Sequence, residues 1–367
     1  MALRVGIVSA GWGAFAHLPA WRAIPGVEVT AICTSRRETA EAAKARLGLP
    51  RAFWNAEAMC ADPDIDIVDL GTRPSVRLPM VLAALQHGKH IYNASPHAPD
   101  WAGAKAIDTA WRAGASVCVV DAFSEYVPAN AQMKTMVDDG YLGTPLGGTC
   151  HFNISLFNSP SKQFPYNWFG QAGQGVSAVR NNGSHALYML THLFGPVSEL
   201  VADDSQVLKK WVFSDGDTVT PETTDYANVI LRFESGLKMQ LQASWSLPLH
   251  DGYLIDVYGS KGRLMVSSPT FPTARDCTLR GGQLGGSLAD ISIADEYKSV
   301  PGIGLDWQTD IQPAFPMARS MHAMVGAIHT RGEASPDFAR ALEIERIQEA
   351  IRISSAERRW IQIAKVE

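Results

Sequence analysis

The sequence predicts an α/β protein in which a domain with a doubly wound parallel sheet precedes an α+β domain with a large, mainly antiparallel open sheet. Three observations predict this architecture. Short apolar runs alternate with helix-like segments up to about residue 122. The turn after the first apolar run is rich in small residues. From about residue 126 onward, strand-like runs follow one another across short turns. We therefore expect two domains, 1–122 and 123–367, with the last helices packing back toward the first domain.

The first domain is expected to begin with a strand over Leu3–Val8, followed by a helix from about Ala14 to Ile24. Short apolar strands joined by helices require right-handed crossovers, and such crossovers build a doubly wound parallel sheet. The further strands are expected at Val27–Cys33, Ile65–Leu70, His90–Tyr92 and Ser116–Val120, and the further helices at Arg37–Leu47, Leu78–His87 and Trp101–Ala113.

The second domain is expected to open with a helix over Pro128–Asp139 and to continue mainly in strands. A helix over Ala186–Phe194 is ended by Gly195-Pro196, a pair that stops helices. The segment 267–310 is rich in Gly, Ser and Pro and is expected to be irregular, before two closing helices at Ala314–Thr330 and Phe338–Glu357. The strands are expected at Gly147–Ser155, Glu199–Asp203, Tyr226–Phe233, Lys238–Ser246, Tyr253–Gly259 and Gly262–Val266.

Composition excludes several classes of partner. The 367 residues carry 32 Lys and Arg against 37 Asp and Glu, and the longest basic run is a pair, so neither nucleic acid nor an anionic membrane is expected as a partner. No apolar run approaches the ~18 residues of a membrane helix, and the start has no secretory signal. The five cysteines lack C-x-x-C spacing, which is typical of reduced, buried thiols in a cytoplasmic protein. No cluster has metal-ligand spacing, so no metal is expected.

The turn after the first strand predicts a dinucleotide site. Ser9-x-Gly11-x-x-Ala14 is a degenerate form of G-x-G-x-x-G, in which the small residues let the backbone approach a pyrophosphate and the helix start supplies free amides. We expect Trp12 to form an adenine-side wall or to pack against the helix. The residues expected to hold the phosphates are Ser9, Ala10, Gly11, Trp12, Gly13 and Ala14.

The end of the second strand favours NADP, with NAD as the alternative. A site for NAD usually has an Asp or Glu about 20 residues after the glycines, to bind the ribose 2′-hydroxyl. This chain has Thr34-Ser35-Arg36-Arg37 instead, where two hydroxyls and two guanidinium groups suit a 2′-phosphate. In the alternative interpretation, Arg36 and Arg37 merely solvate a helix start, although cations are unfavourable at that end of the helix dipole.

The chain resembles the family of glucose–fructose oxidoreductase, inositol 2-dehydrogenase and the MocA rhizopine protein. The resemblance covers nearly the whole chain, and it implies an N-terminal Rossmann domain, a C-terminal domain whose open sheet often mediates homo-oligomer formation, and NAD(P)-dependent chemistry on sugars, cyclitols and polyols. It is carried by Val5-Gly6-Ile7-Val8 with Gly11, by His17-Leu18-Pro19, by Asp62-Pro63-Asp64-Ile65-Asp66-Ile67-Val68, by the run from Leu82 to Ile91, by Gly183-x-His185 and by Gly259-Ser260-Lys261-Gly262.

Three departures from the family pattern bear on catalysis. The family's Glu-Lys-Pro signature, whose lysine sits beside the nicotinamide, reads Ala94-Ser95-Pro96, and a serine hydroxyl supplies no cation. The family's Thr-Pro-x-x-x-His reads Thr72-Arg73-Pro74-Ser75-Val76-Arg77, which introduces two arginines and hints at an anionic substrate. The family's Asp-x-x-x-His-x-x-Asp retains only its histidine, because the equivalent positions are Asn181, His185 and Tyr188.

The resemblance implies that His185 is the acid/base, with Tyr188 or Asn181 orienting the substrate hydroxyl and Ser95 beside the reacting carbon. The spacings of four and three place Asn181, His185 and Tyr188 on one helix face. Besides the residues named above, Thr72, Arg73, Asn93 and Ala94 are expected at the cofactor. The expected substrate contacts are Arg77, His97, Lys162, Tyr166 and Trp168, for which a surface loop position (His97) and simple packing (the loop aromatics) are the alternatives.

Three functions from different classes therefore remain open. The first is an NADP-dependent oxidoreductase that acts on a sugar, a sugar acid or a related polyol or carbonyl compound. The second is a redox-neutral glycosidase or epimerase that keeps its cofactor tightly bound. The third is a non-catalytic NADP-binding regulator, in which the loss of the signature lysine at Ser95 ended the chemistry. A homo-oligomer, dimer or tetramer, is expected in each case.

Overall fold

The computed structural model describes residues 2–160, 166–309 and 313–367. The chain forms two compact units, one of residues 1–123 with 299–343 and one of residues 124–298 with 344–367. The chain passes from the first unit to the second after residue 123, returns to the first for residues 299–343 and ends in the second, so neither unit is one continuous stretch.

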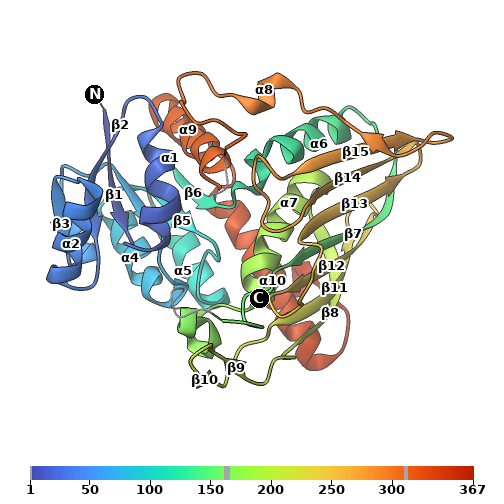
Figure 1. The fold of residues 1–367 in the computed structure, drawn as a ribbon, viewed down its shortest axis with the longest axis horizontal. Coiled ribbons are helices and arrows are strands. Elements are labelled where there is room, and N and C mark those ends of the chain that lie inside the picture. The colour runs from blue at the N-terminus through green and yellow to red at the C-terminus, as the bar shows by residue number, and fades with distance from the viewer. Residues whose placement is uncertain (1, 161–165, 310–312) are drawn as a thin grey trace. The chain divides into compact units, whose positions relative to one another are not determined.

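The first unit is built on a six-stranded parallel sheet in the order β3-β2-β1-β4-β5-β6 (Figure 1). Every expected strand is present, although the third and fifth are shorter at their starts than expected. A short strand and a short helix between residues 51 and 61 had no clear sequence signal. The strands are β1 (Leu3–Val8), β2 (Val27–Cys33), β3 (Arg51–Phe53), β4 (Ile67–Leu70), β5 (His90–Ala94) and β6 (Cys118–Asp121).

Two helices of this unit begin at a residue whose side chain caps the first turn. Asn55 caps α3 by accepting from the amide of Ala58 at 3.1 Å, and Asp100 caps α5 by accepting from the amide of Gly103 at 2.7 Å. The first helix differs from expectation, because its opening turn is a π turn, η1 (Gly13–His17), before α1 (Leu18–Arg22). The others are α2 (Arg37–Leu47), α3 (Ala56–Ala61), α4 (Pro74–Gln86), α5 (Trp101–Arg112) and α9 (Ala314–Thr330), and α9 packs on α1.

The second unit is built on a nine-stranded sheet in the order β16-β15-β14-β13-β7-β12-β11-β8-β17. The sheet is mixed rather than wholly antiparallel, because β7 and β12 pair in parallel at its centre. Figure 1 shows the long strands side by side. They are β7 (Pro145–Asn153), β8 (Val197–Ser205), β11 (Tyr226–Phe233), β12 (Lys238–Ser244), β13 (Tyr253–Gly259), β14 (Gly262–Ser268) and β15 (Thr278–Gln283), with β16 (Ala289–Asp290) and β17 (Ile361–Gln362) at the edges.

One face of this sheet is covered by helices α6 (Pro128–Asp138) and α7 (Ser184–Phe194) (Figure 1). The alternation along β11 shows the covered face, since Val229 and Leu231 are fully buried while Ile230 between them is 48% exposed. The expected irregular segment 267–310 contains β15, β16 and the short α8 (Asp295–Lys298), so this expectation was partly wrong. Helix α10 (Phe338–Glu357) has the expected bounds, and it begins in the first unit and continues into the second.

A separate aromatic cluster lies beside the sheet in the second unit. Phe157 stacks on Trp211 with ring centroids 3.9 Å apart, and Trp245 meets Phe157 edge to face. Phe169, Val176 and Ala178 complete the cluster's buried core. The cluster joins Phe157 and Phe169, on either side of the residues that are not described, to Trp211 in the small hairpin of β9 (Trp211–Val212) and β10 (Thr218–Val219).

Candidate functional site

The turn between β1 and the first helix has the geometry of a phosphate-binding loop. Gly11 is exposed, and a Cβ added there would meet only the Ser9 hydroxyl, at 3.6 Å, so the space beside its backbone is open. Gly13 is buried, and a Cβ there would lie 2.8 Å from Ile7. These two glycines therefore do the two jobs of the motif: one leaves room for a ligand and the other allows the helix to pack on β1.

Ser9 occupies the first position of this motif with a φ of +150°, a backbone conformation that favours glycine. Its hydroxyl accepts a hydrogen bond from the amide of Gly11 at 3.1 Å, which holds the turn in shape. The side chains of Trp12 and Phe15 lie together beyond the turn, with ring centroids 6.2 Å apart. The open space beside Gly11 lies next to the first turn of a helix, where backbone amides without intrahelical partners commonly bind anions.

The end of β2 presents two arginines without carboxylate partners. Thr34 organises this turn, because its hydroxyl contacts the hydroxyl of Thr39 at 2.6 Å and donates to the carbonyl of Arg36 at 3.1 Å. Arg36 and Arg37 are exposed, and neither guanidinium forms an ion pair with a carboxylate in the described part of the chain. Ser35, the residue before Arg36, is exposed as well. The structure thus leaves two positively charged side chains exposed just after the end of β2.

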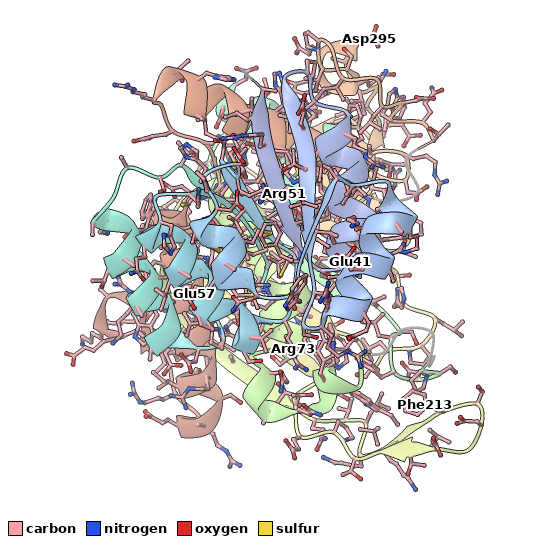
Figure 2. The ribbon with its side chains drawn as sticks, turned by 90° about the vertical axis from the view of Figure 1, so that its left-hand side faces the viewer. Glu41, Arg51, Glu57, Arg73, Phe213 and Asp295 are labelled. Atoms are coloured by element: carbon pink, nitrogen blue, oxygen red, sulfur yellow. The ribbon has the colours of Figure 1, made fainter. Side chains whose placement is uncertain are left out.

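The ends of β4 and β5 lie at the same edge, because all six strands run parallel. Thr72 and Arg73 follow β4, and Arg73, labelled in Figure 2, is half-buried at the start of α4. Asn93 is buried and its amide donates to the ring Nδ1 and the carbonyl of His97, both at 3.0 Å, while its own Oδ1 has no partner among the described residues. The Ser95 hydroxyl is buried, also without a partner there.

Arg77 and His97, both expected at the substrate, are buried and contact other parts of the protein. Arg77 is 1% exposed, and its guanidinium donates to the carbonyls of Thr72 and Pro96, so it ties the turns after β4 and β5 together. His97 is no surface residue: it is buried, and its ring meets Phe338 edge to face at 4.5 Å. The surface-loop alternative for His97 is therefore wrong, whereas the substrate roles of Arg77 and His97 stay predictions.

A buried polar network under the phosphate turn escaped sequence reasoning altogether. His17 lies between two aspartates, with Nδ1 2.7 Å from Asp69 and Nε2 3.0 Å from Asp121. The Trp21 indole donates to Asp69 at 2.6 Å, and the Tyr92 hydroxyl donates to Asp121 at 2.8 Å. Burial disfavours the imidazolium, but the two carboxylates outweigh it and raise the pKa of His17 to about 10.

This network supports the turn directly above it. A Cβ on Gly71, the residue after β4, would lie 3.1 Å from the backbone of Gly13 and 3.5 Å from the His17 ring. The close approach of the Gly71 and Gly13 backbones fixes the position of the phosphate turn relative to β4. His17 was noted in the sequence only as part of a family motif, and no local pattern links it to residues 52 and 104 positions away.

In the second unit, His185 stands on α7 just after a π turn, η5 (Val179–Gly183). The ring is 6% exposed and is flanked edge to face by Phe152 at 6.3 Å and Phe271 at 5.7 Å. Asn181 lies within the π turn, so the α-helical spacing that grouped it with His185 does not apply. Tyr188 is 1% exposed.

The π turn before His185 is firmly anchored within the second unit. Asn182 is buried and donates from its amide to the carbonyl of Ser244 at 3.0 Å. Gln348 on α10 donates to the carbonyl of Val179 at 2.9 Å, and Arg180 pairs with Glu345 at 2.8 Å. The sequence signal for this support was weak, because Asn182 and Gln348 carry no motif.

The structure gives few contacts for the remaining expected substrate residues. Lys162 lies outside the described residues, and Tyr166 begins the short helix η3 (Tyr166–Gly170). Trp168 is partly buried against the aromatic cluster, with its ring 4.3 Å from that of Phe169, so it packs there. This agrees with the packing alternative for that residue.

Several expected absences concern the described residues only. They contain no group of three His, Cys, Asp or Glu side chains that could hold a metal ion. None of their helices is long and apolar enough to cross a membrane. All five cysteines are free thiols and buried.

The sheet order, the phosphate turn and the open sheet of the second unit define a two-unit, dinucleotide-binding protein. Comparisons agree with this class. Residues 3–121 match the oxidoreductase family with an NAD-binding Rossmann fold, and residues 130–265 match the GFO/IDH/MocA C-terminal domain. The chain therefore belongs to the Gfo/Idh/MocA family of oxidoreductases.

Individual relatives fit the same family. A D-apiose dehydrogenase of Paraburkholderia graminis is 30% identical over 71% of this chain and 67% of its own length. A levoglucosan dehydrogenase of Pseudarthrobacter phenanthrenivorans is 22% identical over 99% of both chains. A solved structure of levoglucosan dehydrogenase with NADH and L-sorbose has a TM-score of 0.88, at 22% identity over 99% of each chain, and so shares the fold.

Proposed function

We propose that this chain is an NADP-preferring oxidoreductase that acts on a sugar, a sugar acid or a related polyol. The observation that carries the cofactor preference is the pair of exposed guanidinium groups of Arg36 and Arg37 just after β2, which form no ion pair with a carboxylate of the described residues. A 2′-phosphate would be attracted there, whereas a carboxylate would repel it. The sugar class is supported by the names of the relatives, which are D-apiose and levoglucosan dehydrogenases.

The residues of the first unit supply binding and orientation. The amides around Gly11 would hold the pyrophosphate, Arg36 and Arg37 the 2′-phosphate, and the ends of β4 and β5 the nicotinamide half. The cofactor, when bound, supplies the hydride-transfer chemistry. At and just after the end of β5, the side-chain oxygens of Asn93 and Ser95 have no hydrogen-bond partner within the described part of the chain, and a nicotinamide riboside would satisfy them.

His185 is proposed as the acid/base that exchanges the substrate hydroxyl proton at a ring nitrogen. Its residue type suits proton transfer near neutral pH, and the rings of Phe152 and Phe271 fix the plane of the imidazole. Tyr188 and Asn181 remain proposed as orienting groups, and Tyr188 would act from a buried position.

The cofactor preference and the role of His185 can be tested separately. Replacing both Arg36 and Arg37 by Ala is expected to weaken NADPH binding by at least tenfold and NADH binding little, as measured by calorimetry. Equal losses for both cofactors would show that the arginines do not bind the 2′-phosphate. The His185→Asn variant is expected to bind NADPH normally and to lose about a hundredfold in kcat; full activity would remove His185 from the mechanism.

The residue in place of the signature lysine favours a second candidate function, an NADP-binding protein without net turnover. The Ser95 hydroxyl is buried and carries no charge, so it cannot replace an ammonium group next to a developing alkoxide. Such a protein would bind NADPH tightly and leave it unchanged with every substrate. A redox-neutral glycosidase or epimerase would instead form product without net consumption of NADPH.

Substrate charge and assembly complete the proposal. Since Arg77 is buried in backbone contacts, we assign the preference for an anionic substrate to Arg73, and Arg73→Ala should raise KM for a sugar acid but not for a neutral sugar. A homo-oligomer formed through the exposed face of the nine-stranded sheet is proposed from the exposed Ile230 and Tyr258 on it, and light scattering after gel filtration tests it.

A further inference from the structure

Trp54 is an exposed tryptophan at the edge of the sheet where the nucleotide is proposed to bind. It follows the last residue of β3 and is 47% exposed, which is unfavourable for so large an apolar ring in water. The amide of Thr34 donates to the carbonyl of Phe53 at 3.1 Å. This hydrogen bond joins the end of β3 to the end of β2, so the backbone before Trp54 is held beside the turn that carries Arg36 and Arg37.

The Trp54 ring lies under one of these two arginines. The guanidinium carbon of Arg37 stands 5.2 Å from the centroid of the Trp54 ring, a cation–π contact. The contact uses none of the N–H donors in an ion pair or a hydrogen bond to a carboxylate, and these donors have no such partner among the described residues. These donors are the ones that bind a phosphate through two parallel hydrogen bonds.

The neighbouring charges do not offer Arg37 a better partner. Arg51, at the start of β3 and labelled in Figure 2, also lies over an aromatic ring, that of Phe53, but it is bound to Asp62. Glu38 and Glu57, the acidic residues in the first turns of α2 and α3, form no ion pair with Arg37. Arg37 is therefore held in place by an aromatic ring and not by a carboxylate, which keeps its charge available for an anion.

We propose that Trp54 is a positioning residue for the recognition of an adenosine 2′-phosphate. It holds the Arg37 guanidinium at the end of β2 before the ligand arrives, so that less side-chain freedom is lost on binding. This inference rests on the proposed NADP preference and extends it to a residue outside the phosphate turn and outside β2. The ligand class is a nucleotide with a phosphate on the 2′-oxygen of its adenosine.

The test compares two small probes, adenosine 2′,5′-bisphosphate and adenosine 5′-monophosphate, which differ only in the 2′-phosphate. Their affinities for the full-length protein are measured by calorimetry for the wild type, Trp54→Ala and Trp54→Phe. Trp54→Ala is expected to weaken the bisphosphate by about two- to fivefold, the range of an exposed cation–π contact, and to leave the monophosphate unchanged. Trp54→Phe is expected to recover most of the loss.

Trp360 provides a matched control. It is 37% exposed and lies under Arg232 at 4.2 Å, in the second unit, so Trp360→Ala removes the same kind of contact away from the proposed subsite. This variant should bind both probes as the wild type does. If Trp54→Ala does not fold, Trp54→Leu and Trp54→Phe decide the point, because both fill the space and only the second stacks.

The outcomes distinguish this inference from the proposed function. A wild type that binds both probes equally overturns the NADP preference and the role of Trp54 with it. A wild type that prefers the bisphosphate, together with a Trp54→Ala variant whose preference is unchanged, overturns the role of Trp54 alone. Equal weakening of both probes would make Trp54 a general structural support and would also overturn the inference.

Discussion

Replacing His17 by Gln tests the buried network beneath the phosphate turn. The substitution removes a cation that lies 2.7 Å from Asp69 and 3.0 Å from Asp121, both of them buried. Two carboxylates would then share a space without a counter-charge, and a glutamine amide cannot bridge both. Breaking a buried charge network by removing one partner costs about 3–5 kcal/mol, so we expect a loss of stability in this range at neutral pH.

The pH dependence of this loss has a definite sign. Burial lowers and the two aspartates raise the pKa of His17, with a net rise to about 10, whereas an unfolded histidine titrates near 6.5. The stabilisation is therefore complete below about pH 6.5 and is lost as the pH rises toward 10, by up to about 1.4 kcal/mol per pH unit. The free-energy difference between the wild type and His17→Gln should shrink over that window.

The assay is urea unfolding followed by tryptophan fluorescence, at several pH values between about 6.5 and 10. Tyr92→Phe serves as the control, because it deletes the hydroxyl that donates to Asp121 at 2.8 Å and leaves the charges in place. That variant should lose about 1.5–3 kcal/mol, with the same loss across the window. A difference between wild type and His17→Gln that stays constant from pH 6.5 to 10 would refute the raised pKa of His17.

Two further predictions concern backbone fit and a buried carboxyl. Gly71→Ala places a Cβ 3.1 Å from the backbone of Gly13, so NADPH affinity should fall about tenfold in a binding titration. Gly114→Ala is the control, because its Cβ would have its nearest neighbour at 3.9 Å, and it should leave NADPH affinity unchanged. Equal affinities for the two variants would contradict the packing argument. Burial raises the pKa of Asp204 to about 7 from 3.8, so folding is favoured by its protonation and wild-type stability falls as the pH rises between these values. Asp204→Asn removes that pH dependence. Its free energy of unfolding in urea should gain about 2 kcal/mol relative to the wild type between about pH 4 and 8, after allowance for partial exposure. Parallel pH profiles for the two proteins would count against the raised pKa.

Sequence periodicity predicted those elements that are long or flanked by strong signals. The bounds of β1, β2, α2, α9 and α10 agree with expectation, because each has a clear apolar period or a clear break at its ends. The strand β3 was missed because three residues are too few to show a period, and β15 because its glycines resemble a loop.

The candidate site was less predictable because much of it depends on contacts between distant residues. The phosphate turn and the arginines after β2 are local, and the structure places them at one edge of the sheet. The burial of Arg77 and His97 follows from backbone carbonyls and a ring that no local pattern reveals. The π turns at η1 and η5 likewise have no sequence signature, so the helical spacing around His185 was misjudged at Asn181.

The measurement that tests the central claim most directly is the absorbance of NADPH mixed with the protein and a panel of keto-sugars, lactones and aldehydes, with product analysis and a parallel series in NADH. We predict loss of NADPH absorbance matched by a reduced product, and slower loss with NADH at the same concentration. Tight NADPH binding with neither absorbance change nor product across the panel would contradict the assignment as an oxidoreductase, and product without loss of absorbance would replace it with a redox-neutral reaction.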